Sequence, residues 1–116
     1  MSTRRGAKAG DVVVRRKKMK ILDDAFELAL NADGANSHAE AKDRLQAKYP
    51  QVQWEEIVSF YLRACALVDA CYGIGDACRG KKFTDEMAMS YMKKKFPGFS
   101  KATYTAALAY AYFIGR

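Results

Sequence analysis

The feature that most constrains this fold is a helix stop that occurs twice in the chain. An aromatic residue followed by proline appears at Tyr49-Pro50 and again at Phe96-Pro97, an offset of 47 residues. Proline lacks a backbone N–H and restricts the residue before it, so a helix is expected to end at each site. Each stop lies between two apolar segments of helical periodicity. The sequence therefore predicts two helical hairpins built on one repeated unit.

A further helix is expected in front of the two hairpins. Met19, Leu22 and Phe26 recur at spacings of three and four residues and form one apolar stripe. The expected fold is all-α, a five-helix bundle made of an N-terminal helix and two helical-hairpin (helix-turn-helix-like) units. The predicted boundaries are a flexible basic arm at 1–10, a first helix at 11–32, a hairpin unit at 37–72, a basic glycine-containing loop at 73–83 and a second hairpin unit at 84–115, with residues 11–116 forming one domain.

Polar residues predict where several of these helices begin and end. Ser37 and Glu40 form a capping box for the second helix, and Thr84 and Ser100 are in position to cap the fourth and fifth. Two glycines, at 73 and 75, are expected to end the third helix after Tyr72. The same glycines are what predict a loop, rather than helix, up to residue 83.

The positive charge of the chain is concentrated at its N-terminus. Residues 1–20 hold eight basic residues and one acid, whereas the rest of the chain holds twelve of each, so the net charge of +7 belongs to this segment. Such a segment binds polyanions by neutralising phosphates, or it is a solubilising tail that binds nothing in particular. The phosphate contacts predicted here are Arg4, Arg5, Arg15, Arg16, Lys17 and Lys18.

A second basic group surrounds the last hairpin. Residues 71–116 carry eight bases against three acids, whereas residues 21–70 carry nine acids against four bases, so the middle of the chain is expected to repel nucleic acid. The predicted phosphate contacts in this part are Arg79, Lys81 and Lys82 in the loop, Lys93, Lys94 and Lys95 before the turn, and Lys101 after it.

The second hairpin also resembles the skeleton of a helix-turn-helix DNA reader. In that role Ser100, Thr103 and Tyr104 would approach base edges. However, the last helix has no Arg, Asn or Gln between Lys101 and Arg116, and these are the side chains that most often read bases. The sequence therefore favours a DNA- or RNA-binding protein that contacts phosphates through its arm and its C-terminal half.

A protein-interaction, inhibitor or adaptor module is the other interpretation. The last helix is rich in small and aromatic residues, and aromatic residues are enriched where interfaces bury area. A buried tyrosine also needs a partner for its hydroxyl group, which favours an outward or interface position for some of the seven tyrosines. The predicted interface residues are Tyr104, Tyr110 and Tyr112, in a homodimer or with a protein partner.

Catalysis is not expected. The sequence contains no nucleophile–base pair and no Cys/His metal pattern, so it predicts no enzyme, no cofactor and no metal site. Cys65, Cys71 and Cys78 are expected to be reduced and structural. The sequence contains no run of about 18 apolar residues, so no membrane span is expected. A cytoplasmic protein is expected, or a nuclear one in a eukaryote.

Overall fold

Five helices make up the described part of the chain. The computed structural model describes the backbone of residues 2–114 and the side chains of residues 13–114, and within these limits it contains no strand. The predicted all-α five-helix fold is confirmed. The helices are α1 (Ser2–Asn31), α2 (Ala35–Lys48), α3 (Trp54–Arg79), α4 (Asp85–Lys95) and α5 (Lys101–Ile114).

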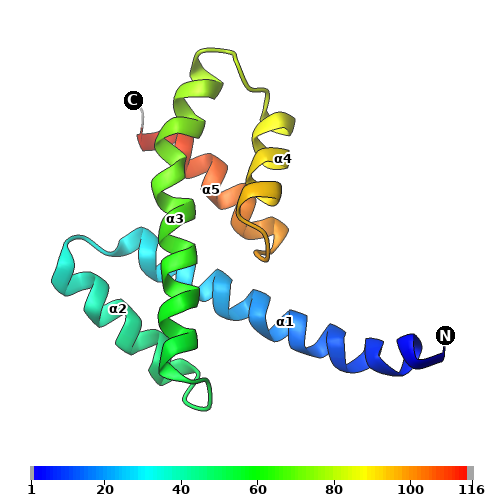
Figure 1. Ribbon diagram of the computed structural model, residues 1–116. Coiled ribbons are helices and arrows are strands. Elements are labelled where there is room, and N and C mark those ends of the chain that lie inside the picture. Colours follow the sequence, from blue (N-terminus) through cyan, green and yellow to red (C-terminus); the bar gives the residue numbers. More distant parts are fainter. Residues whose placement is uncertain (1, 115–116) are drawn as a thin grey trace.

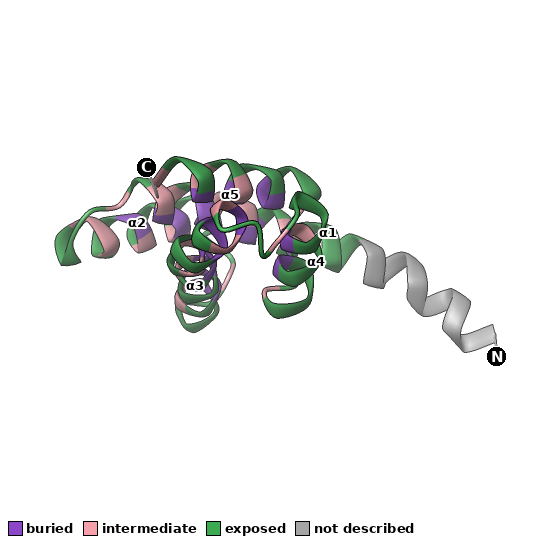
Figure 2. Cartoon of the chain, turned by 90° about the horizontal axis from the view of Figure 1, so that it is seen from above, coloured by how far each residue is buried: buried purple, intermediate pink, exposed green. Residues whose placement is uncertain are grey.

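The long helix α3 is the centre of the fold. α2 packs along its first half, α1 crosses its middle, and α4 and α5 pack along its second half (Figure 1). The molecule measures only 17 Å along its shortest principal axis, which corresponds to two layers of helices. Buried residues lie between the layers, and both outer faces are exposed (Figure 2).

α1 is longer than the sequence predicts. Its backbone is helical from Ser2, where a separate arm was expected over residues 1–10, and the side chains of Arg4 and Arg5 lie outside the described residues. Residues 13–18 are all exposed, and the core begins with Ile21 and Leu22. The first described cations of α1 therefore project beyond the core.

The two aromatic-proline stops have the same backbone conformation. Tyr49 has φ −127° and ψ 68°, and Phe96 has φ −128° and ψ 70°. Each ends its helix as predicted, and each amide hydrogen-bonds back into the last helical turn. The repeat is therefore real at these two stops.

The predicted side-chain caps are confirmed in the second hairpin. Thr84 Oγ1 accepts a hydrogen bond from the amide of Met87 at 3.1 Å, and Ser100 Oγ accepts one from the amide of Thr103 at 3.2 Å. The predicted cap at Ser37 is wrong. α2 begins earlier, at Ala35, because the chain already turns into the helix at Gly34. Ser37 thus lies inside the first helical turn.

Side-chain hydrogen bonds hold α2 in place. His38 Nδ1 lies 2.6 Å from the hydroxyl of Tyr61 on α3. At the other end of α2, the hydroxyl of Tyr49 donates to Asp24 on α1. Burial and the neighbouring carboxylate raise the pKa of Tyr49 well above its usual range, so this hydroxyl stays protonated as a donor.

The predicted end of the third helix at Tyr72 is wrong. α3 continues through Gly73 and Gly75 to Arg79, so the connection to α4 is much shorter than the loop predicted over 73–83. A Cβ on Gly75 would overlap the carbonyl oxygen of Ala111, so this glycine lets α5 cross α3 at close range. The extra turns also bury Ile74 and Cys78. This packing offsets the cost of glycine in a helix, roughly 1 kcal/mol.

Within the described residues, α3 is also the one helix with the length and composition of a membrane span. Its apolar residues include Ile57, Tyr61 and Leu67, which are fully buried against the other helices. Packing in this fold accounts for these buried residues, whereas Leu62 and Tyr72 on the same helix are exposed. The absence of a membrane partner stays a prediction.

We expect Gly75→Ala to destabilise the protein by about 1–3 kcal/mol, because the added methyl group must push α5 away from α3. Gly73→Ala is the matched control: it lies two residues away in the same helix, and a Cβ there would have no other atom within 4 Å. That change should be neutral or stabilising by about 0.5–1 kcal/mol. Urea unfolding measures both, and equal effects would contradict the close crossing.

Cys71 allows a second test of the core. It is fully buried between α3 and α5, and its thiol lies 3.3 Å from the carbonyl oxygen of Leu67. Burial raises the pKa of the Cys71 thiol to about 12, from an ordinary value of 9.0. Between these values the unfolded chain ionises and the folded chain does not, so stability falls as pH rises.

We therefore expect the wild type to lose about 1 kcal/mol more than Cys71→Ala between about pH 9 and about pH 10. The tyrosines ionise in both proteins, so their contribution to the pH dependence of stability cancels in this comparison. Urea unfolding under reducing conditions at each pH measures the difference. Parallel pH profiles would show that Cys71 ionises equally well in the folded protein.

Candidate nucleic-acid interface

The turn between α4 and α5 is held by two other helices at one place. The amide of Ser100 donates to Asp23 Oδ1 on α1 at 3.0 Å. Arg63 Nη2 on α3 donates to the carbonyl oxygen of Pro97 at 2.8 Å. These two hydrogen bonds bring the turn, α1 and α3 together, although they come from distant parts of the sequence.

Gly98 makes this approach possible. It has φ +103°, a left-handed conformation that side chains rarely adopt. A Cβ at this position would also lie 2.9 Å from Arg63 Nη2 and 2.9 Å from Leu22 Cδ1. A larger residue would displace the arginine from the turn.

A groove with cationic edges lies around this turn. It consists of two adjoining hollows of about 290 and 260 Å³, which share Arg63 and Phe99. We call it the basic groove. Its residues are Arg15, Lys18, Met19, Leu22, Arg63, Ala66, Lys95, Phe96, Pro97, Gly98 and Phe99.

Among the described side chains, the cations of the basic groove form no ion pair. The described residues form two ion pairs, Lys48 with Asp24 and Arg79 with Asp76, and neither includes a groove cation. Asp23 on α1 is half-buried and already accepts the Ser100 amide. The groove thus presents positive charge above an apolar floor.

The structure brings together only some of the predicted phosphate contacts. Arg15 and Lys18 line the basic groove from α1, and Lys95 lines it from the end of α4. Arg16 and Lys17 are exposed but do not line it. Lys93, Lys94 and Lys101 are also exposed on α4 and α5, and Lys94 lines a separate hollow.

The three cations predicted in the loop lie outside the basic groove. Arg79 is in the last turn of α3, where it pairs with Asp76 at 2.6 Å and donates to the carbonyl oxygen of Ala111 at 3.3 Å. Lys81 and Lys82 are exposed before α4, whereas Lys95 ends that helix about 16 Å further along. The predicted contacts therefore do not form a single surface.

α5 is not arranged as a recognition helix. Thr103 and Tyr104 are buried, and the Tyr104 hydroxyl donates to the carbonyl oxygen of Phe96 at 2.5 Å. Tyr104 is therefore a core residue and is not available to a partner. Tyr110 is half-buried, and Tyr112 is exposed with its hydroxyl 2.6 Å from Asp85. An interface role remains a prediction for these two tyrosines.

Arg63 is the one cation of the basic groove that the sequence did not predict as a phosphate contact. It lies in the acidic middle of the chain, where counting charges predicts repulsion of nucleic acid. Only the packing of α3 against the α4–α5 turn shows that it faces Pro97 and Gly98. Gly98, which follows the second aromatic-proline stop, is a sequence signal for a tight turn. It does not indicate that Arg63 contacts that turn.

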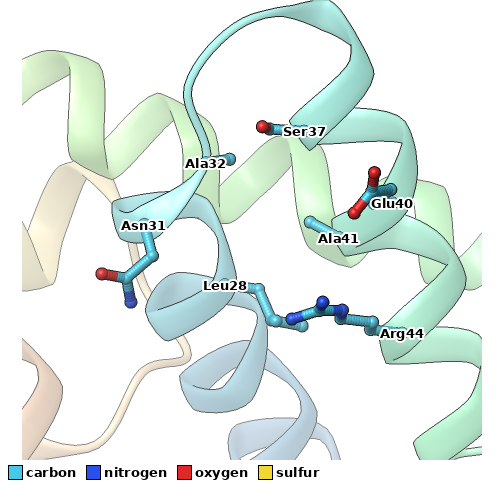
Figure 3. A pocket seen from close by; sticks show the side chains of 7 residues that line it. All are labelled: Leu28, Asn31, Ala32, Ser37, Glu40, Ala41 and Arg44. Atoms are coloured by element: carbon cyan, nitrogen blue, oxygen red, sulfur yellow. The ribbon is translucent and has the colours of Figure 1, made fainter.

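A different hollow, of about 200 Å³, lies between the end of α1 and the start of α2 (Figure 3). Glu40 and Arg44 on α2 line it, with Arg44 extending toward Leu28. One acid and one base give its wall no net charge. It therefore offers a weaker attraction for phosphate than the basic groove does.

We expect Asp23→Ala to lower the free energy of unfolding by about 1–2 kcal/mol, because the half-buried Ser100 amide loses its charged acceptor. Glu27→Ala is the control, since Glu27 is an exposed acid one turn further along α1. Thermal unfolding of both variants measures the difference. A loss no larger than that of the control would show that Asp23 does not hold the turn.

Comparisons with protein-family models, curated proteins and solved structures found no match to this chain. The functional interpretation therefore depends on the geometry and charge of the basic groove.

Proposed function

We propose that this protein binds nucleic acid without catalysing a reaction, and that the basic groove contacts the phosphates. The observation that carries the proposal is the convergence of Arg15, Lys18, Arg63 and Lys95 on one groove. They come from three helices, and none takes part in an ion pair within the described residues. Cations arranged in this way bind a polyanion by releasing its counterions.

Arg63 is suited to be the central contact. Its guanidinium group has five N–H donors in a planar fork, and its hydrogen bond to Pro97 holds that fork in place. The remaining donors are free to bind two oxygens of one phosphate group. Arg15, Lys18 and Lys95 would supply charge on either side of it.

The apolar floor supports the same proposal. Phe96 is half-buried and Pro97 is exposed beside the cations, so a bound backbone could cover them with its sugars. Arg15 and Lys18, both exposed, extend the positive surface along α1. Binding would depend on shape and charge rather than on base sequence.

A second candidate is a protein-interaction surface at the far end of α3 and α5. Tyr72 and Phe113 are 62% and 67% exposed there, which is high for large apolar side chains. Tyr72 and Tyr110 also line a common hollow of about 170 Å³. Sedimentation that depends on protein concentration, and that Phe113→Ser abolishes, would support a homodimer through this surface.

We expect Arg15→Ala/Lys18→Ala to weaken binding of a labelled DNA by roughly tenfold at about 50 mM salt. The slope of log affinity against log salt should fall by about two, one for each lost phosphate contact. Fluorescence anisotropy between about 50 and about 200 mM salt measures both quantities.

The matched control is Arg16→Ala/Lys20→Ala. It removes the same charge from the same exposed part of α1, but these residues do not line the groove. On a helix they lie about 100° or more from Arg15 and point away from α3. Equal losses from both double variants, or no binding by the wild type at low salt, would disprove the proposal.

A further inference from the structure

A row of three aromatic side chains leads away from the basic groove along α4. The ring centroid of Tyr91 lies 5.8 Å from that of Phe83 and 6.5 Å from that of Phe96. Phe96 lines the basic groove. Tyr91, in the middle of the row, is 38% exposed.

The exposed side of this row forms a hollow of about 420 Å³. We call it the aromatic hollow; its residues are Phe83, Glu86, Met87, Ser90, Tyr91 and Lys94. The Tyr91–Phe96 contact joins it to the basic groove. An elongated ligand could therefore pass from the cations of α1 to the exposed ring of Tyr91 without leaving the surface.

We propose that this combined surface binds single-stranded nucleic acid, with a base stacked on Tyr91. The inference rests on the proposed function, and it names the form of nucleic acid that the protein prefers. Proteins that bind single strands combine a cationic groove along the backbone with aromatic side chains on which bases stack. Both parts are present here and are contiguous.

The cations are in the right places for this arrangement. Lys95 lines the basic groove and the next residue back, Lys94, lines the aromatic hollow. The two lysines point about 100° apart on the helix, so each of the two hollows receives one of these positive charges. A strand passing Phe96 would keep its phosphates close to a cation, while Glu86 lies on the far side of the hollow.

A duplex does not use this surface equally well. Its bases are paired and stacked inside the helix, so its phosphates could contact the lysines but would leave Tyr91 and Met87 uncovered. These side chains are 38% and 49% exposed. A single strand presents the faces of its bases and can cover both. A helical peptide could also cover them, but it would not need the continuous line of cations.

The test compares a labelled oligothymidylate of about 12 nucleotides with a duplex of the same length, by fluorescence anisotropy at about 50 mM salt. We expect the single strand to bind more tightly. Tyr91→Ala should weaken single-strand binding by roughly tenfold and leave duplex binding unchanged. Tyr91→Phe keeps the ring and should bind like the wild type.

Trp54→Ala is the matched control, because Trp54 is an exposed aromatic residue that lines neither the basic groove nor the aromatic hollow. Unchanged duplex binding by Tyr91→Ala also shows that the variant is folded. The inference is overturned if Tyr91→Ala weakens both ligands equally or neither, or if it alters self-association instead. If the single-strand inference fails but Arg15→Ala/Lys18→Ala still weakens duplex binding, the proposed nucleic-acid-binding function stands. If the wild type binds neither the single strand nor the duplex, the proposed function and the inference both fail.

Discussion

The distance between α3 and α5 is the constraint on which the rest of the structure depends. At Gly75 the two helices approach so closely that a methyl group would overlap the backbone of Ala111. This crossing allows Ala107 and Ala111 to be buried against α3, and Cys71 lies beside the same contact. Because α5 is fixed there, the turn that precedes it has only one position relative to α3.

That position is what creates the basic groove. The turn reaches α1 and α3 together, where Asp23 accepts one hydrogen bond from its backbone and Arg63 donates one to it. Gly98 leaves the space that the arginine occupies. The cations on α1, α3 and α4 are therefore brought together by backbone contacts, and within the described residues none of them forms an ion pair.

The aromatic residues divide into two groups with different consequences. Tyr49, Tyr61 and Tyr104 use their hydroxyl groups inside the molecule, joining helices or closing a turn. Tyr91 has an exposed ring whose neighbours are other rings and a lysine. The first three tyrosines stabilise the fold. The exposed ring of Tyr91 provides a flat, uncharged contact surface beside the positively charged groove.

Local sequence determined the helical class of this protein, the two aromatic-proline stops and the caps at Thr84 and Ser100, because each depends on residues within one turn of helix. It did not determine the course of α3, since the two glycines that predict an end are tolerated where α5 packs against one of them. For the same reason, charge counted along the chain identified Lys18 and Lys95 but assigned Arg63 to the acidic middle. Which cations share a groove was decided only by tertiary structure, because the contacts that bring them together join residues more than thirty positions apart.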